Sequence, residues 1–308
     1  MTELIEARSH AALWKLRTRT LALGPRTLVM GVVNITPDSF SDGGLFLDPP
    51  AAIARSMQWL DEGADLLDLG AESTRPGSHA GSASAAQVSA DEEQARLLPV
   101  LEAVLKARSD AIVSVDTYKA ATARTALAAG AEIVNDVSGF SWDPELASIC
   151  ADAGCGVVLM HTRGRPDEWA AQPQLTSDEL LNSVRSGLQS SLDRAAVAGI
   201  AAESIVLDPG YGFGKRGQEN FALLARQAEL LALARPLLAG LSRKSFLGHA
   251  LAPLHGGRPA PVDSREAASL AAMVAAILNG ASIVRVHQVR AAVEAARVVD
   301  AIRQPASE

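Results

Sequence analysis

Eight short apolar runs, each followed by a stretch with helical character, repeat along the chain and restrict its possible folds most strongly. The runs are rich in β-branched residues and mostly apolar on both faces, as buried parallel strands are. They are LVMGVVN (28–34), DLLDLGAE (65–72), AIVSVD (111–116), EIVND (132–136), GVVLMH (156–161), SIVLDPG (204–210), PLLAGLS (236–242) and SIVRVH (282–287). The helical stretches lie around 50–63, 91–108, 118–130, 143–154, 176–199, 218–234, 264–280 and 288–303. Eight such units predict a closed (β/α)8 barrel, with a doubly wound sheet as the alternative, because periodicity does not show closure.

The repeats occupy residues 28–303 and predict one α/β domain, a single TIM barrel that would carry the catalytic site. Residues 1–27 are expected to form a helical N-terminal extension, and residues 304–308 a short C-terminal tail. The extension contains no continuous apolar segment before a small-residue cleavage site. The chain also has no run of about 18 apolar residues, the length that a membrane span needs. We therefore expect a cytoplasmic protein.

The charge and the cysteine content limit the partners of the chain. A formal net charge of −7 disfavours general attraction to nucleic acid or to anionic membranes, so an anionic ligand would need locally placed Arg and Lys side chains. Cys150 and Cys155 have no neighbouring His or further Cys and are expected to be reduced thiols. The six His residues form no HxH or HExxH pattern, which disfavours a metal hydrolase.

All eight predicted strands end in hydrogen-bonding or charged residues. They are Asn34; Glu72 with Ser73, Thr74 and Arg75; Asp116; Asn135 and Asp136; His161; Asp208; Ser242, Arg243 and Lys244; and Arg285 with His287. In a barrel these ends lie together and form the active site. A ring of partly buried polar groups is costly unless a ligand satisfies it. For Asp136 alone, the preferred interpretation is a cap of the next helix.

The polar strand ends also indicate the chemistry of a ligand. Asp116, Asn135 and Asp208 offer carboxylates and an amide, which suit a flat heterocycle with adjacent N–H donors and acceptors. Lys244, Arg285 and His287 offer cationic groups, which suit phosphate or a ring oxygen. Arg285 and His287 alternate with Val286, so both should point to the same side of the last strand. The alternative for this pair is an ion pair with helix carboxylates.

The strands and the loops that follow them contain six longer motifs. They are MGVVNITPDSFSDGG (30–44), GADLLDLGAESTRPGS (63–78), SVDTYKAATARTALAAGAEIVNDVSG (114–139), VLDPGYGFGK (206–215), LAGLSRKSFLG (238–248) and RVHQV (285–289). Together these motifs resemble those of the dihydropteroate synthase family. The resemblance covers roughly residues 28–303. It implies a (β/α)8 fold and a transferase that joins 4-aminobenzoate to 7,8-dihydropterin-6-ylmethyl diphosphate. The products would be diphosphate and 7,8-dihydropteroate, a folate precursor.

The resemblance also implies a role for each matching residue. Residues 34–44 and 73–78 match two mobile loops of the family. The pterin would be held by Asp116, Asn135, Asp208 and Lys244, with Met160 and Phe213 against its ring; the diphosphate by Thr74, Arg285 and His287; and aminobenzoate by Phe40, Pro76 and Ser242. Arg75 would help to close its loop, and Asn34 and Asp42 would hold Mg²⁺, the implied cofactor.

The reaction implied by the resemblance is a dissociative substitution. Diphosphate would leave first, assisted by Mg²⁺, Arg285 and His287, and the weakly nucleophilic aromatic amine would capture a cation-like carbon. Asp116 and Asp208 would support the positive charge on the pterin ring, and Lys244 would complete the catalytic set. The family is usually a homodimer and is the target of sulfonamides, so the expected partners are small-molecule substrates and a second copy of the chain.

Two other functions share some of these residues. A pterin-binding methyltransferase that serves a corrinoid protein would keep the pterin acids but would not need the motifs at 34–44 and 73–78. A non-catalytic pterin-binding or phosphate-binding paralogue is disfavoured because Asn34, Arg75, Lys244 and Arg285 are all present. The chain departs from the usual family pattern at Thr162, Arg163, Tyr211 and Gln288, and residues 252–262 lengthen the loop before the seventh helix.

Overall fold

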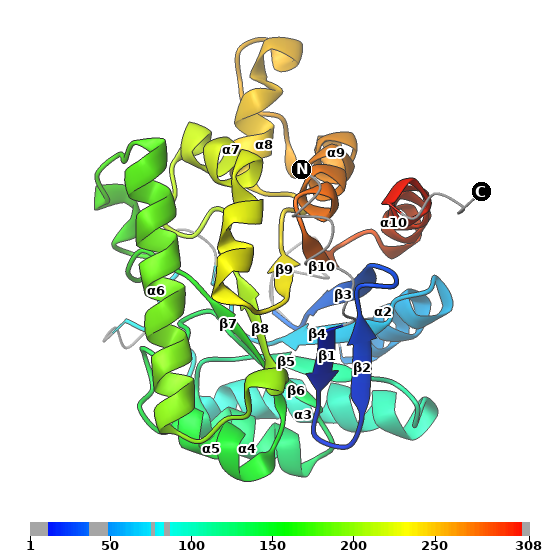
Figure 1. Ribbon diagram of the computed structural model, residues 1–308. Helices are drawn as coiled ribbons and strands as arrows, with labels where there is room; N and C mark the ends of the chain where they lie inside the picture. The colour runs from blue at the N-terminus through cyan, green and yellow to red at the C-terminus, as the bar shows by residue number, and fades with distance from the viewer. Residues whose placement is uncertain (1–11, 37–48, 75–77, 83–86, 304–308) are drawn as a thin grey trace, which may run out of the picture.

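The computed structural model describes residues 12–36, 49–74, 78–82 and 87–303, and eight parallel strands within these ranges close into a barrel (Figure 1). Around the barrel the strand order is β10-β3-β4-β5-β6-β7-β8-β9. The strands are β3 (Leu28–Asn34), β4 (Leu66–Gly70), β5 (Val113–Asp116), β6 (Ile133–Asp136), β7 (Gly156–Met160), β8 (Ile205–Asp208), β9 (Leu237–Ala239) and β10 (Ala281–Val286). The predicted (β/α)8 barrel is therefore confirmed, and the doubly wound alternative is excluded.

Helices follow the strands and surround the barrel (Figure 1). They are α2 (Pro49–Asp61), α3 (Ala90–Ala107), α4 (Ala120–Ala128), α5 (Leu146–Ala153), α6 (Ser177–Val197), α7 (Gly217–Ala225), α8 (Ser245–Ala250), α9 (Glu266–Leu278) and α10 (Val289–Arg303). Short 3-10 turns lie at Trp169–Ala171, Ala202–Ser204, Gln227–Leu233, Ala252–His255 and Val262–Ser264. The start of α6 shows how the sequence sets a boundary, because Thr176 and Glu179 form a reciprocal capping box there.

The long loop after β9 contains the insertion noted in the sequence. Together with α8, residues 252–264 form a lobe that projects from the barrel (top of Figure 1). Leu254, within this lobe, is 80% exposed. The insertion therefore lies apart from the barrel interior.

Alternation along each strand divides its side chains between two environments. Side chains on the outward face, such as Val29, Leu67 and Val113, pack against the helices. An inward-facing apolar layer fills the barrel and consists of Met30, Leu66, Ile133, Val158, Val206, Leu238 and Ile283. Two residues further along four of these strands, a polar layer replaces it and consists of Asp68, Asn135, Asp208 and Arg285. The barrel interior thus changes from apolar to polar toward the carboxyl ends of its strands.

Residues 12–23 form a β-hairpin, so the expected helical extension is wrong over this range. β1 (Ala12–Lys15) pairs antiparallel with β2 (Thr20–Leu23). Trp14 and Leu16 are buried whereas Leu13 is exposed, which is the period of a strand and not of a helix. Trp14 packs on the apolar layer and donates from Nε1 to the Ser204 carbonyl oxygen at 3.0 Å. The hairpin therefore covers the amino-terminal end of the barrel; residues 1–11 of the predicted extension lie outside the described residues.

The hairpin is also attached to the barrel by polar contacts. Glu132, which precedes β6, accepts hydrogen bonds from the backbone N–H of Thr18 at 2.9 Å and from the Thr18 hydroxyl. Arg17 donates from Nε to the Ala131 carbonyl oxygen at 3.0 Å. These contacts hold the hairpin turn against the amino-terminal end of β6.

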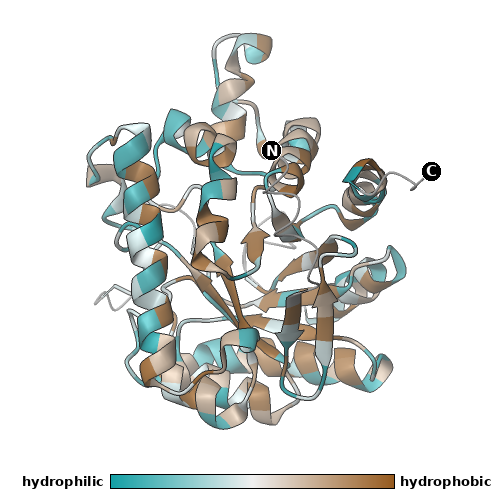
Figure 2. Ribbon diagram, in the orientation of Figure 1, coloured by the Kyte–Doolittle hydropathy of each residue, from teal (hydrophilic) through white to brown (hydrophobic). Residues whose placement is uncertain are grey.

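The hydropathy of the molecule follows the same layers. The barrel strands are predominantly hydrophobic (brown in Figure 2), whereas hydrophilic residues (teal) concentrate on the surrounding helices and loops. Among the described residues, no helix is both long enough and apolar enough to cross a membrane.

Candidate active site

The centre of the candidate site is Arg285, whose guanidinium bridges two carboxylates inside the barrel. Its Nε donates to Asp68 Oδ2 at 2.6 Å, and a terminal nitrogen donates to Asp116 Oδ2 at 2.7 Å. Asn135 donates from Nδ2 to the same Asp68 oxygen at 3.0 Å. Asp68 is fully buried, and its Oδ1 has no hydrogen-bond partner among the described residues. Side chains of β4, β5, β6 and β10 thus form one network that retains an unused acceptor at its core.

A second pair of charges stands at the ends of β8 and β9. Asp208 is buried and accepts a hydrogen bond from the Gly210 backbone N–H at 2.7 Å. Lys244 places Nζ 4.0 Å from the centroid of the Phe213 ring, a cation–π contact. Gly212 lies under the Lys244 side chain, where a Cβ would come within 3.3 Å of Cδ. The loop after β8 and the residues after β9 therefore meet at Lys244.

Burial perturbs the ionisation of these groups. Burial raises the pKa of Asp116 to about 7, although Arg285 opposes the rise. Burial also raises the pKa of Asp208, against the lowering effects of the Gly210 N–H and Lys244. The pKa of Lys244 is lowered to about 8 by burial, with Asp208 acting in the opposite direction. Several shifted groups that converge in one barrel mouth are typical of a binding or catalytic site.

The Arg285 guanidinium retains its positive charge within the network. Burial alone would lower the pKa of its guanidinium, but the neighbouring Asp68 and Asp116 carboxylates raise it above its usual value. An ion pair of this kind becomes strongly unfavourable if one partner is removed. The two carboxylates therefore depend on Arg285 for compensation until a ligand contributes donors.

Apolar side chains form a wall beside the polar network. Met160, at the end of β7, belongs to a cluster with Ala80, Tyr118 and Val137, and Phe213 packs against it. Met160 pairs in register with Asp208 on the neighbouring strand. A flat heterocycle could therefore be bounded by apolar surface while its edge meets carboxylate and amide groups.

His287 and Ser242 connect the ends of β10 and β9. Ser242 Oγ lies 3.1 Å from His287 Nδ1 and also accepts from the His287 backbone N–H at 3.3 Å. Arg285 faces the barrel interior two residues earlier on β10, but its guanidinium contacts the strand carboxylates. Among the described residues, the Arg285 guanidinium pairs with the strand residues Asp68 and Asp116 and not with a helix carboxylate, which was the alternative for this residue.

The remaining predicted residues divide into two groups. Asn34 ends β3 in register with Gly70, and Thr74 lies four positions beyond β4; both are half-buried at the same end of the barrel. The predicted positions Phe40, Asp42, Arg75 and Pro76 lie outside the described residues.

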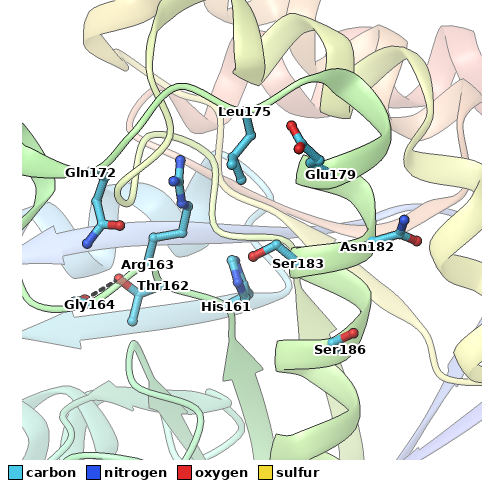
Figure 3. Close-up of a pocket in the computed structure, with 10 residues that line it drawn as sticks. All are labelled: His161, Thr162, Arg163, Gly164, Gln172, Leu175, Glu179, Asn182, Ser183 and Ser186. Carbon is cyan, nitrogen blue, oxygen red and sulfur yellow. Dashed lines mark hydrogen bonds between the residues drawn. The ribbon is translucent and has the colours of Figure 1, made fainter.

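Two of the polar residues at strand ends, Asp136 and His161, lie outside the central network. Asp136 faces outward and accepts hydrogen bonds from the backbone N–H groups of Ser138 and Phe140, in the turn after β6. The next helix, α5, begins at Leu146 with Glu145 at its N-cap, so the predicted role of Asp136 as a helix cap is wrong. The ring of His161 lies against Gly187 of α6, in a cleft on the outer side of β7 (Figure 3). Burial holds the pKa of His161 well below its usual value, so its imidazole is neutral.

Asp68 is the site residue that sequence reasoning missed. It lies in the middle of the apolar run LLDLG, whereas the predicted polar site residues stand at strand ends. The available signal was a lone carboxylate at an inward position of a buried strand, where it must find a cationic or N–H partner.

Two of the departures from the family pattern, Tyr211 and Arg163, have their polar contacts away from the central network. Tyr211 is fully buried and its hydroxyl donates to Gln227 Oε1 at 2.8 Å. Arg163 pairs with Glu219 at 3.4 Å and donates to the Gly214 carbonyl oxygen. The contacts of Tyr211 and Arg163 therefore stabilise the loop after β8.

A closed barrel whose mouth combines this polar network with an apolar wall is the architecture of a pterin-binding enzyme. The sequence profile of the family described as "Pterin binding enzyme" matches residues 30–287. A dihydropteroate synthase of Mycobacterium leprae is 44% identical over 273 residues, which are 89% of this chain and 92% of that protein. The chain belongs to the dihydropteroate synthase family.

Solved structures agree with this assignment. The Yersinia pestis dihydropteroate synthase, solved as a complex with a sulfonamide drug, superposes with a TM-score of 0.84 at 39% identity. That match covers 96% of this chain and all of the other. A Xanthomonas albilineans dihydropteroate synthase in complex with 7,8-dihydropteroate gives a TM-score of 0.78 at 37% identity, over 95% of this chain and all of the other. Each of these two structures therefore matches the fold of this chain along nearly its whole length.

Proposed function

We propose that this protein is a dihydropteroate synthase. It would join 4-aminobenzoate to 7,8-dihydropterin-6-ylmethyl diphosphate and release diphosphate. The observation that carries the proposal is the buried network of Asp68, Asn135, Arg285 and Asp116, which leaves an acceptor oxygen unused inside the barrel mouth. The family membership and the dihydropteroate complex of the Xanthomonas albilineans relative support the same reaction.

The pterin would occupy the space between the polar network and the apolar wall. Its amino group and ring N–H groups are donors, and Asp116, Asn135 and Asp208 supply acceptors of the matching kind. Lys244 would donate to a ring oxygen, and Met160 with Phe213 would pack against the ring. Each charge-assisted hydrogen bond of this kind contributes about 1.5–3 kcal/mol.

The diphosphate would lie at the carboxyl end of β10. The loops after the last two strands of such barrels commonly bind phosphate, and His287 with Ser242 is located there. Thr74 and Arg285 would contribute further donors. Aminobenzoate would enter beside Ser242, with Phe40 and Pro76 as the other walls and Arg75 as a closing residue.

The donor set of the described residues is compatible with a substrate-bound Mg²⁺. No cluster of three or more His, Cys, Asp or Glu suited to a metal occurs in the part of the chain that the structure describes. Mg²⁺ commonly needs only one or two protein oxygens besides phosphate oxygens and water, and the half-buried Asn34 amide provides one. Asn34 and Asp42 would hold the ion. When bound, Mg²⁺ would neutralise charge on the diphosphate and so favour its departure.

The residues of the chain would assist two successive steps, the departure of diphosphate and the attack by the aromatic amine. The bond between the exocyclic carbon and the diphosphate oxygen breaks with its electron pair on diphosphate, where His287 and Arg285 stabilise the negative charge. The positive charge left on the pterin ring is supported by the nearby carboxylates of Asp116 and Asp208. The aromatic amine of aminobenzoate attacks that carbon and afterwards loses a proton, which completes dihydropteroate.

The oligomeric state and the compartment are further parts of the proposal. We expect a homodimer, which light scattering of the purified chain would test. A cytoplasmic location is supported by Cys150 and Cys155, both free and buried thiols.

The decisive experiment is an assay of the purified protein with both substrates and Mg²⁺, with dihydropteroate detected by mass spectrometry. Formation of dihydropteroate is expected, and Asp208→Asn should weaken pterin binding measured by calorimetry. Arg258, an exposed residue of the projecting lobe, offers the control Arg258→Gln. If the protein binds the pterin but forms no product, the non-catalytic pterin-binding alternative replaces the proposal.

A further inference from the structure

The three residues that follow Asp116 contact the segment that connects β4 to α3. They are Thr117, Tyr118 and Lys119, and they lead directly from β5 into α4. Their side chains reach Glu72 just after β4, Gly81 within the connection, and Glu93 in the first turn of α3. Because Asp116 belongs to the central network, these contacts connect the pterin side of the site with the segment that carries Thr74.

The contact at the start of the segment is a buried ion pair. Lys119 Nζ lies 2.5 Å from Glu72 Oε2 and 3.4 Å from Glu93 Oε2. The side chains of Lys119, Glu72 and Glu93 are only 10%, 6% and 1% exposed. Burial lowers the pKa of Lys119, but the two glutamates raise it above its usual value, so the ammonium is retained. One cation therefore holds the first turn of α3 and the residue that lies two positions before Thr74.

The contacts at the middle and the end are hydrogen bonds. The Tyr118 hydroxyl accepts from the Gly81 backbone N–H at 2.9 Å and from Gln87 Nε2 at 2.6 Å. Thr117 donates from Oγ1 to Glu93 Oε2 at 3.0 Å. The backbone of Gly81 lies so close to the Trp142 ring that a Cβ would come within 2.6 Å of it. In the described parts of this connection and of α3, contacts from three consecutive residues thus hold Glu72, Gly81 with Gln87, and Glu93.

A purely structural role does not account for the charges of this cluster. Exchange of a buried ion pair for apolar side chains of similar volume is often neutral or stabilising. Glu93 also retains an oxygen, Oε1, without a hydrogen-bond partner among the described residues, and burial raises the pKa of this carboxyl. What the ion pair does provide is a fixed position for Glu72, which lies two residues before Thr74.

We propose that Lys119 is a positioning residue of the reaction, which acts through Glu72 to place Thr74 beside the diphosphate. The proposal rests on the proposed function, because it needs a substrate that bears diphosphate. It predicts a separation of effects: loss of the ion pair weakens the use of the pterin diphosphate and leaves binding of the bare pterin intact. In the proposed function the bare pterin meets Asp116, Asn135 and Asp208, and among the described residues Lys119 forms its ion pairs with Glu72 and Glu93 and with none of these three. Lys119 Nζ also lies 4.6 Å from the centroid of the Tyr118 ring, a contact that Glu72→Gln leaves in place.

The experiment compares Lys119→Met, Glu72→Gln and the double variant with the unaltered chain. Lys119→Met should raise KM for the pterin diphosphate about tenfold or more, while the affinity for 6-hydroxymethyl-7,8-dihydropterin, measured by calorimetry, stays within about twofold. Glu72→Gln, which keeps the side-chain shape, should give the same pattern, and the double variant should be no worse than Lys119→Met alone. Lys106→Met, the same change at an exposed position of α3, is the control.

Three outcomes overturn the proposal. Unchanged KM in both single variants would show that the ion pair has no part in substrate use. Equal loss of affinity for the pterin with and without diphosphate would show that the cluster only supports the pterin pocket. Additive effects in the double variant would show that Lys119 does not act through Glu72. If Lys119→Met fails to fold by circular dichroism, Glu72→Gln alone decides between the first two outcomes. Absence of product from the unaltered chain would instead refute the proposed function.

Discussion

Asp68 and Arg285, which are 217 positions apart in the chain, meet at 2.6 Å in the interior of the barrel. The contact joins β4 to β10, two strands on either side of β3. The guanidinium also donates to Asp116 on β5 at 2.7 Å, so in the proposed reaction Arg285 supports the pterin carboxylates as well as the diphosphate. The ion pair therefore contributes to folding as well as to the shape of the site.

Asp68→Asn should reduce the stability of the barrel. The change leaves the Arg285 guanidinium with a single buried carboxylate partner, and removal of one partner of a buried pair costs up to about 3–5 kcal/mol. Urea unfolding would measure the loss. Asp61→Asn, which affects an exposed pair with Arg108, is the control and should cost less than about 1 kcal/mol. Equal stability of the two variants would contradict the assignment.

Arg285→Lys should not restore the function of Arg285. The guanidinium contacts Asp68 and Asp116 at the same time, whereas an ammonium is a single point charge. We expect kcat/KM to fall about tenfold or more, with weaker binding of the pterin lacking diphosphate as well. Calorimetry would show unchanged pterin affinity if Arg285 served only the diphosphate.

The pH dependence of kcat/KM should be bell-shaped. The Asp116 carboxyl, with its pKa raised to about 7 by burial, loses its negative charge as the pH falls through that value. The Lys244 ammonium, with its pKa lowered to about 8 by burial, loses its positive charge as the pH rises through that value. Activity should therefore be highest between about pH 7 and 8, since kcat/KM reports the groups of the free enzyme. Asp116→Asn should remove the acid limb and Lys244→Met the alkaline limb; a limb that persists belongs to another group.

Trp14→Ala should destabilise the protein without altering its chemistry. Trp14 is fully buried beneath the apolar layer, and truncation of a buried Trp costs about 3–5 kcal/mol. Turnover at a temperature well below the unfolding transition should stay unchanged. The neighbouring Leu13 is 57% exposed, so Leu13→Ala should have little effect on thermal unfolding. A fall in kcat at low temperature would mean that the hairpin influences the site.

The barrel and most of its site could be predicted because both follow from alternation along strands. Asn135, Asp208 and Arg285 each stand two positions beyond an inward apolar residue of the same strand, and this pattern is readable in the chain. The same rule places His161 on the outer face, since it directly follows the inward Met160. Applied strictly, alternation would also have identified Asp68, which stands two positions after Leu66.

Other features depend on tertiary contacts that no local pattern contains. Residues 12–23 form strands because Trp14 and Leu16 find an apolar surface at the end of the barrel, and that surface exists only after closure. The pairing of Lys119 with Glu72 spans 47 positions, and its geometry depends on how β4 and β5 stand side by side.

The apolar layer beneath the polar layer has a consequence for how this chain can change over time. Burial of Met30, Leu66, Ile133 and their neighbours supplies cohesion at a depth that no ligand reaches. Substitutions at the mouth, where an inhibitor would bind, can therefore accumulate without eroding the part of the barrel that keeps it folded. Adaptation to an inhibitor would be limited by what the reaction tolerates, and much less by the thermodynamic margin of the scaffold.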